Sequence, residues 1–208
     1  KKIQEHNPDL IALQEVFDAQ SNRKLVRTLN QKGYDCAHSI LAKEQTRLSS
    51  GLLIAVKRKG NKALSIKKVE SWKLTNGVGI DRFANKGLVG AEIELGGETL
   101  YFFNTHLQAS YGKKGYGSSR KSQVQSICQK INEWTNRSGK VLLCGDLNFA
   151  KEKIEEGDDH TEYKCQLEIL KSVDLIDPSE KLDAKEEGGG SYIHIKNENI
   201  RSNSIADY

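Results

Sequence analysis

The stretch VLLCGDLNFA, residues 141–150, decides the fold and presents the first candidate functional residues. A short apolar run that leads into Gly145 is typical of a buried strand ending in a loop. Asp146 and Asn148 follow, so such a strand would deliver two polar side chains to one edge of a sheet. The same residues also suit an ordinary turn, in which Gly, Asp and Asn serve only the backbone. The stretch alone leaves both interpretations open.

Two other apolar segments end on polar residues in the same way. In NPDLIALQEVF, residues 7–17, the predicted strand ends on Glu15, and in LYFFNTHLQAS, residues 100–110, it ends on His106. Hard divalent cations prefer oxygen ligands, and phosphoester hydrolysis concentrates negative charge on phosphoryl oxygens. The set therefore predicts hydrolysis of a phosphoester.

LQEVF, NTHLQA and GDLN follow one another along the chain, and in this ordered set the sequence resembles the metal-dependent endonuclease/exonuclease/phosphatase superfamily. The segment NKGLVGAEIELGGETLYFFNTHLQA, residues 85–109, most resembles the neutral sphingomyelinases. The resemblance extends over nearly the whole chain. It implies an α/β fold, a two-layer mixed β-sandwich flanked by helices (the DNase-I-like fold). It also implies phosphoric diester hydrolysis with Mg²⁺ as the cofactor, Mn²⁺ being the alternative.

Length and composition agree with a single catalytic domain over residues 1–208, a length that can bury a sizeable core. The formal net charge of +4 helps to attract an anionic substrate or a membrane surface but selects neither. No apolar run approaches the length that a bilayer crossing needs, so no transmembrane segment is expected in this chain.

The cysteines give little information on the compartment. The four of them are far apart and form no CxxC pair, which argues against a zinc site: Cys36, Cys128, Cys144 and Cys165. We interpret them as free thiols packed as small hydrophobes, with one disulfide as the alternative. A secreted protein and a protein at a cytosolic leaflet both remain open.

The resemblance also implies that the domain is incomplete at both ends. Residues 1–6 have the pattern of a helix end, whereas the superfamily ordinarily begins one strand and one helix earlier, with an Asn of the metal site. SIADY, residues 204–208, resembles the start of a late strand in which an Asp orients a catalytic His. Asp207 matches that Asp, and the sequence ends before the His.

Between the motifs, strand and helix patterns alternate without a linker. Helices are predicted at 18–31, 119–136 and 162–177, and strands at 51–59 and 63–74, the latter of edge type. Residues 87–95 and 99–105, separated by Gly96-Gly97, predict a hairpin. The hairpin favours mixed sheets over a doubly wound parallel sheet, and the resemblance decides for the sandwich.

The metal and water sites are assigned to the loop residues. Glu15 is predicted to bind Mg²⁺, which keeps several waters and needs only one or two protein carboxylates. Asp146 and Asn148 are predicted catalytic residues that position and activate the attacking water or hold a second cation. An extended segment would place both on one side, with Leu147 directed into the core.

His106 is predicted to be catalytic, donating a hydrogen bond to a phosphoryl oxygen in the transition state. A lone His on an apolar strand is often a core residue, but Thr105-His106-Leu107-Gln108-Ala109 matches the superfamily at each step. Asn104 would share the face of His106 and contact the substrate, with a structural hydrogen bond as an equal alternative.

The segment DRFANKG, residues 81–87, distinguishes the subfamily. Asp81 and Lys86 match an Asp and Lys of the eukaryotic neutral sphingomyelinases. Lys86 would contact a lipid phosphate, and Asp81 would hold or release Lys86. A loop salt bridge without consequence is the alternative, and Arg82 is a less specific candidate for the same phosphate.

Three functions follow. The leading one is hydrolysis of sphingomyelin to ceramide and phosphocholine, with a phospholipid at a membrane surface as partner and peripheral membrane contact. The loop ASYGKKGYGSSRK, residues 109–121, suits a membrane interface, a nucleic-acid backbone or plain solvent. The alternatives are a nuclease of the same superfamily and a noncatalytic binding module. A nuclease would be expected to carry an Arg in the strand that ends IADY, and Ser204, Ile205 and Ala206 supply none. An inositol-phosphate phosphatase is a weaker option.

Overall fold

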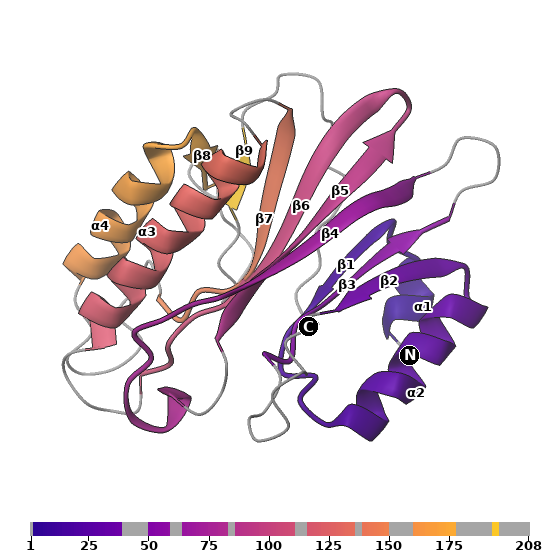
Figure 1. The fold of residues 1–208 in the computed structure, drawn as a ribbon, viewed down its shortest axis with the longest axis horizontal. Coiled ribbons are helices and arrows are strands. Elements are labelled where there is room, and N and C mark those ends of the chain that lie inside the picture. Colours follow the sequence, from indigo (N-terminus) through magenta and orange to yellow (C-terminus); the bar gives the residue numbers. More distant parts are fainter. Residues whose placement is uncertain are drawn as a thin grey trace.

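Two β-sheets packed face to face form the centre of the molecule, with helices on both outer faces (Figure 1). The structure is a computed structural model, and it describes residues 2–38, 50–58, 64–82, 86–110, 116–135, 139–149, 160–177 and 193–195. The described part is thus a sandwich of four layers, helix, sheet, sheet and helix, which confirms the predicted fold class.

The smaller sheet contains three strands in the order β1-β3-β2, and all its pairs are antiparallel. They are β1 (Leu10–Leu13), β2 (Tyr34–His38) and β3 (Leu53–Lys57). On the outer face lie α1 (Lys2–His6) and α2 (Ala19–Gln31). Asp18 caps α2 by accepting a hydrogen bond from the Ser21 amide.

The larger sheet contains six strands in the order β4-β5-β6-β7-β9-β8. They are β4 (Ser65–Lys73), β5 (Gly87–Leu95), β6 (Glu98–His106), β7 (Lys140–Asp146), β8 (Leu175–Ile176) and β9 (Ile193–Ile195). Among the described strands of this sheet, β6 pairs with β7 in parallel, and the other pairs are antiparallel. The outer face is covered by α3 (Tyr116–Thr135) and α4 (His160–Lys171), and the 3₁₀ helix η1 (Gly79–Arg82) lies between β4 and β5.

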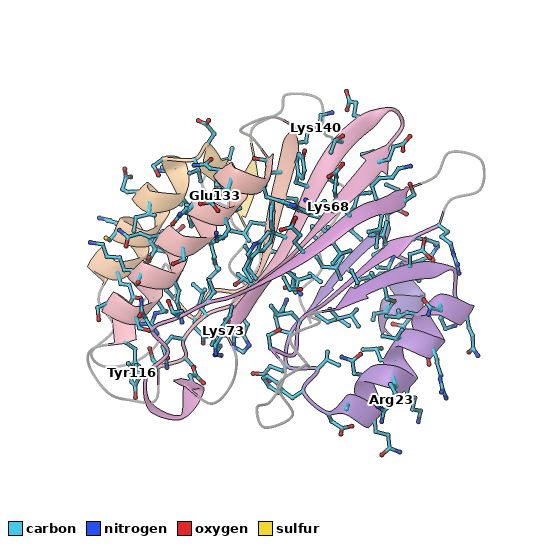
Figure 2. All side chains as sticks on the ribbon, in the orientation of Figure 1. Arg23, Lys68, Lys73, Tyr116, Glu133 and Lys140 are labelled. Atoms are coloured by element: carbon cyan, nitrogen blue, oxygen red, sulfur yellow. The ribbon has the colours of Figure 1, made fainter. Side chains whose placement is uncertain are left out.

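The core follows from the alternation of side chains along β5 and β6. Leu88 and Phe103 belong to the cluster that packs under α3, whereas Val89 and Phe102 belong to the cluster between the two sheets. A third cluster joins α2 to the smaller sheet. The polar faces of the helices point outward, and Figure 2 shows this for Arg23 and Glu133, which are both exposed.

Most predicted elements are found, with three corrections. The hairpin of β5 and β6 turns at Gly96-Gly97, and β4 is the predicted edge strand. However, β1 ends at Leu13 and leaves Glu15 in the following loop. Helix α3 begins at Tyr116, inside the segment that was predicted to be a loop. Helix α4 ends at Lys171, because Asp174 has a φ of 61° and residues 175–176 join β8.

All four cysteines carry free thiols, and Cys128 is buried. Burial raises the pKa of the Cys128 thiol to about 12. Among the described helices, none combines the length and the apolar character required to cross a membrane.

Candidate active site

The site is built where the parallel strands β6 and β7 end together. His106 and Asp146 are direct partners in the strand register, so the sheet places their backbones side by side. Gly145 makes this approach possible, because a Cβ at this position would collide with the carbonyl oxygen of Thr105. Its φ of 142° is likewise a conformation that side chains rarely adopt.

A tight turn follows Asp146. The Asn148 amide donates to Asp146 Oδ1 at 2.9 Å, and Asn148 Nδ2 donates to the Leu107 carbonyl at 3.0 Å. Leu147 is buried in the core, as predicted. The reason differs from the predicted alternation, because Asn148 has a φ of 53° and the segment is a turn closed by the Asp side chain.

His106 is buried and faces the exposed Asp146. Their closest atoms, His106 Nε2 and Asp146 Oδ2, are 3.7 Å apart, and the side chains are 4% and 51% exposed respectively. The other ring nitrogen, Nδ1, is buried without a hydrogen-bond partner within the described part of the chain. The imidazole is therefore held by packing and presents one nitrogen toward the carboxylate.

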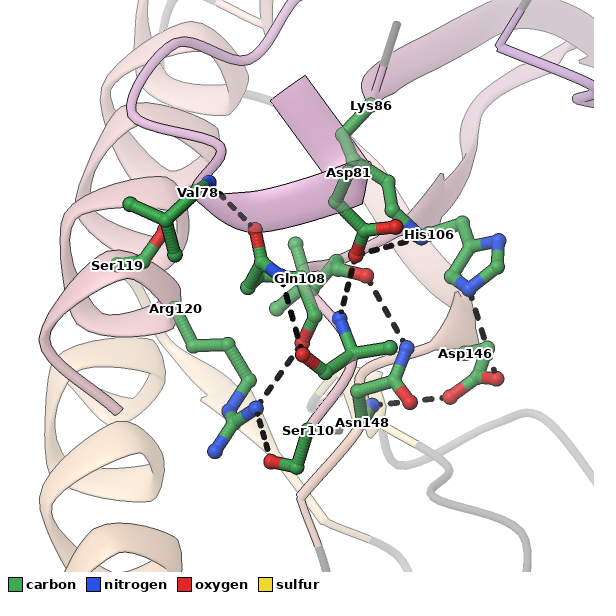
Figure 3. Close-up of polar contacts among 12 residues, drawn as sticks. Val78, Asp81, Lys86, His106, Gln108, Ser110, Ser119, Arg120, Asp146 and Asn148 are labelled. Carbon is green, nitrogen blue, oxygen red and sulfur yellow. Dashed lines mark hydrogen bonds and ion pairs between the residues drawn. The ribbon is translucent and has the colours of Figure 1, made fainter. Parts of the chain in front are cut away.

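Asp81 and Lys86 form a buried ion pair beside His106 (Figure 3). Lys86 Nζ lies 3.5 Å from Asp81 Oδ2, and both side chains are about 5% exposed or less. Asp81 Oδ2 also accepts a hydrogen bond from the Ala109 amide at 2.8 Å. The predicted pair is thus present, and it is a buried contact rather than a loose surface salt bridge.

These groups are close enough to alter one another's protonation. Burial lowers the pKa of His106, and the positive charge of Lys86 lowers it further, against the opposing effects of Asp146, Glu15 and Asp81. Burial also lowers the pKa of Lys86, while Asp81, Asp146 and Glu15 oppose that shift. Glu15 therefore acts electrostatically on the same site, and the lowered pKa of His106 favours the neutral form of its ring.

Glu15 lies in the loop after β1 with an exposed side chain and a φ of 60°. Among the described residues other than glycine with a positive φ, it is the one that is neither Asn nor Asp. The next residue, Val16, donates its amide to the Gly51 carbonyl at 2.9 Å. A left-handed Glu is uncommon, and held backbone outliers of this kind cluster at functional sites.

Asn104, predicted either to contact the substrate or to make a structural hydrogen bond, makes structural hydrogen bonds in this fold. Its side chain is fully buried, and its amide is occupied by hydrogen bonds to the other sheet: Nδ2 donates to Leu13 O at 2.8 Å and to Leu53 O at 3.0 Å, and Oδ1 accepts from Gln14 Nε2 at 2.6 Å. These contacts correspond to the structural alternative.

A buried polar brace behind the site was not anticipated from the sequence (Figure 3). Arg120 on α3 donates to Gln108 O at 3.0 Å and to Ser110 Oγ at 2.8 Å, and it forms a bidentate pair with Glu162 on α4 at 2.5 and 2.7 Å. Gln123 Oε1 accepts the Gln108 amide at 2.9 Å. The signal in the sequence was that Arg120 and Gln123 share the buried face of α3 with Val124 and Ile127.

Several predicted residues lie outside the described part of the chain. Asp207 is one of them, as are residues 111–115 of the loop at 109–121. The backbone of Arg82 is described within η1, but its side chain is not. Their predicted roles stay predictions.

The donor set suits a hard divalent cation. Glu15 and Asp146 are exposed carboxylates near one buried imidazole and one buried amine. No group of three or more His, Cys, Asp or Glu side chains gathers around one point in the described ranges. Mg²⁺ needs only one or two carboxylates because it keeps much of its water, so these residues fit it.

Residues 2–185 match the family model described as Endonuclease/Exonuclease/phosphatase family 2, and the chain belongs to this family. It is 28% identical over 180 residues to sphingomyelinase C of Bacillus cereus, with 79% of this chain and 52% of that protein covered. It is also 28% identical over 163 residues to a DNA-(apurinic or apyrimidinic site) endonuclease of Dictyostelium discoideum, covering 74% and 37%. The chain thus spans about half the length, or less, of these relatives.

Solved structures share the fold of this chain. Sphingomyelinase C from Streptomyces griseocarneus has a TM-score of 0.68 at 18% identity, with 93% of this chain and 72% of that chain covered. A beta toxin variant from Staphylococcus aureus with bound magnesium ions has a TM-score of 0.67 at 19% identity, covering 89% and 70%. At these identities the likeness shows the fold.

Proposed function

We propose that this chain is the catalytic part of a divalent-cation-dependent phosphodiesterase that hydrolyses sphingomyelin to ceramide and phosphocholine. The observation that carries the proposal is the grouping of buried Lys86 and buried His106 with the exposed carboxylates of Asp146 and Glu15. The similarity to sphingomyelinase C supports the choice of substrate.

Glu15 is the residue proposed to hold Mg²⁺, or Mn²⁺ in its place, with Asp146 and Asn148 as candidates for a second cation. A bound cation of this kind supplies Lewis acidity at a phosphoryl oxygen and lowers the pKa of bound water. In the beta toxin variant of the same fold, magnesium ions are bound.

The chain's own residues supply positioning and charge. Asp146 and Asn148 orient the water whose oxygen attacks phosphorus, and the turn between them fixes their spacing. His106 donates a hydrogen bond to a phosphoryl oxygen, for which a neutral ring suffices. The bond between phosphorus and the ceramide oxygen breaks, that oxygen takes up a proton, and the oxygen from water stays on phosphocholine.

Lys86 is the proposed contact to the lipid phosphate, and Asp81 controls whether its amine is available. In the structure the amine is paired and buried, so binding the phosphate requires that Lys86 exchange one anionic partner for another. Asp207 is proposed to orient a catalytic His. The partner in this reaction is a phospholipid at a membrane surface, which the formal charge of +4 would help to approach.

A nuclease is the second candidate, because the chain is similar to an apurinic or apyrimidinic endonuclease over 74% of its length. The same groups would serve a nucleic-acid phosphodiester, since only the leaving group differs. A noncatalytic binding module is the third reading, and the same experiment decides among the three.

The test uses the protein that contains this chain at its natural length, with Mg²⁺, on sphingomyelin vesicles and on plasmid DNA. We expect phosphocholine release that is abolished by a chelator and by Glu15→Ala but not by Glu168→Ala, a change at an exposed residue on α4. Nicking of DNA without lipid turnover would move the assignment to the nucleases. Inactivity on both substrates would overturn the proposal in favour of another phosphoester or a binding role.

A further inference from the structure

Asn104 connects the two sheets next to the loop that carries Glu15. It lies on β6 with its side chain fully buried, yet its hydrogen bonds go to the smaller sheet. Its Nδ2 reaches the carbonyls of Leu13 and Leu53, and its Oδ1 accepts from Gln14. One amide thus joins β6 to the last residue of β1, to the first residue of β3 and to the side chain just before Glu15.

Glu15 is therefore held on both sides. On its N-terminal side, Leu13 and Gln14 are bound to Asn104 at 2.8 and 2.6 Å. On its C-terminal side, the Val16 amide is bound to Gly51 O at 2.9 Å. Between these anchors the backbone of Glu15 adopts a φ of 60°, which a Glu rarely adopts unless its neighbours fix it.

We propose that Asn104 is a positioning residue that fixes the carboxylate of Glu15 for cation binding, with Gln14 as the second member of the same contact. This inference rests on the proposed function, in which Glu15 holds the cation. The residues that orient a metal ligand through hydrogen bonds matter because the cation requires its oxygen ligands at short, well-defined distances. Loss of the Asn104 amide would leave one buried carbonyl, Leu53 O, and one partly buried carbonyl, Leu13 O, without this donor and release the loop.

The experiment measures binding of Mn²⁺ alone, by electron paramagnetic resonance of the free ion, to the full-length protein and its variants. Asn104→Leu keeps the volume and removes the amide, and Gln14→Met removes only the contact at 2.6 Å. We expect Asn104→Leu to weaken Mn²⁺ binding about 10- to 100-fold, the range for residues that orient metal ligands, and Gln14→Met to weaken it less. Glu15→Gln should remove the site.

A purely structural role would not produce this pattern. Thr135→Val is the matched control, because it removes a buried side-chain hydrogen bond to Ile131 O of 2.8 Å on α3. It should lower the unfolding midpoint and leave Mn²⁺ affinity unchanged. In activity assays, Asn104→Leu should raise the Mn²⁺ concentration needed for half-maximal rate, while the rate at saturating Mn²⁺ stays near that of the unaltered protein.

The outcomes separate the inference from the proposed function. If Glu15→Gln binds Mn²⁺ normally, the assignment of Glu15 as ligand fails and the inference fails with it. If Glu15→Gln loses binding while Asn104→Leu keeps it, the inference is overturned and the proposed function stands. Should Asn104→Leu not fold, Gln14→Met decides, and an unchanged affinity in that variant would overturn the inference.

Discussion

The segment 106–110 after β6 and the segment 14–17 after β1 present site residues in opposite ways. The first is buried for most of its length, and side chains of α3 and η1 bind its backbone at Gln108 and Ala109. The second carries an exposed Glu15 and is held by one buried amide, Asn104, and one backbone hydrogen bond.

This difference in burial matches the kind of charged group that lies at each segment. The buried segment serves His106 and Lys86, whose charged forms burial disfavours, so the protein has to supply partners such as Asp81. Carboxylates that are to bind a cation have the opposite need, because they should stay hydrated and accessible until the cation arrives. A brace of side chains suits the first task, and a constrained backbone suits the second.

Breaking the brace should have the largest effect on stability. Glu162→Gln leaves the buried guanidinium of Arg120 without its bidentate partner, and loss of one member of a buried pair costs about 3 kcal/mol or more. Urea unfolding measures this, with Glu168→Gln on the same helix as the exposed control. Equal midpoints for the two variants would show that the pair does not brace segment 106–110.

The second largest loss of stability is expected from a substitution at the paired ends of β6 and β7. Gly145→Ala should destabilise the fold by about 2–4 kcal/mol, because the added Cβ collides with the Thr105 backbone and φ is unfavourable. Gly97→Ala, which has a positive φ of 91° with nothing within 4 Å, is the control for the backbone effect alone. A Gly145 variant no less stable than the control would mean that β6 and β7 can separate freely at His106 and Asp146.

A substitution at Gly51, which packs against segment 14–17, should cost less stability than one at Gly145. At Gly51 a Cβ would lie 2.8 Å from Phe17 Cδ1 and 3.0 Å from the Val16 nitrogen, and the Phe17 ring can rotate away. We expect Gly51→Ala to lower the free energy of unfolding by about 1–3 kcal/mol and to weaken Mn²⁺ binding through Glu15. Gly145→Ala should instead disturb Asp146. Urea unfolding and Mn²⁺ titration of both variants measure the two effects. A loss of stability larger than that of Gly145→Ala would reverse the comparison between the two segments.

The two segments also differ in how far the sequence predicts them. The apolar strand before His106 and the GDLN stretch indicate a sheet edge, and the hairpin at Gly96-Gly97 indicates mixed sheets, because these signals are local. The resemblance placed Asp81 beside Lys86, and the structure brings them together.

What the sequence did not predict depends on contacts between distant residues. Asn104 meets Gln14 across 90 residues, and Arg120 meets Glu162 across 42 residues. No periodicity reports such pairs, so the sequence left a substrate contact and a structural hydrogen bond equally open for Asn104, and the brace was missed. The left-handed backbone at Glu15 was equally invisible, since Glu itself has no preference for it.

The smallest effect concerns pH and tests whether burial and Lys86 act on His106 together. The pKa of His106 lies below its ordinary value of 6.5 because of burial first and the charge of Lys86 second. As the pH falls through 6.5, His106 therefore takes up a proton in the unfolded chain before it does so in the folded chain. Stability from this group is therefore full above pH 6.5 and falls as the pH drops from there toward the lowered pKa.

The double variant Asp81→Asn/Lys86→Met removes the lowering effect of Lys86 together with the smaller, opposing effect of Asp81, and it leaves burial in place. The pKa of His106 should rise toward 6.5, and the loss of stability between pH 7.5 and pH 5, a range chosen to be roughly one unit or more on either side of 6.5, should become shallower. NMR titration of the imidazole in the presence of a chelator measures the pKa, with the resonance assigned from His106→Gln. Lys67→Met, at an exposed lysine of β4, is the control. An unchanged pKa of His106 in the double variant would mean that burial alone lowers this pKa. The positive charge of Lys86 would then have no part in it.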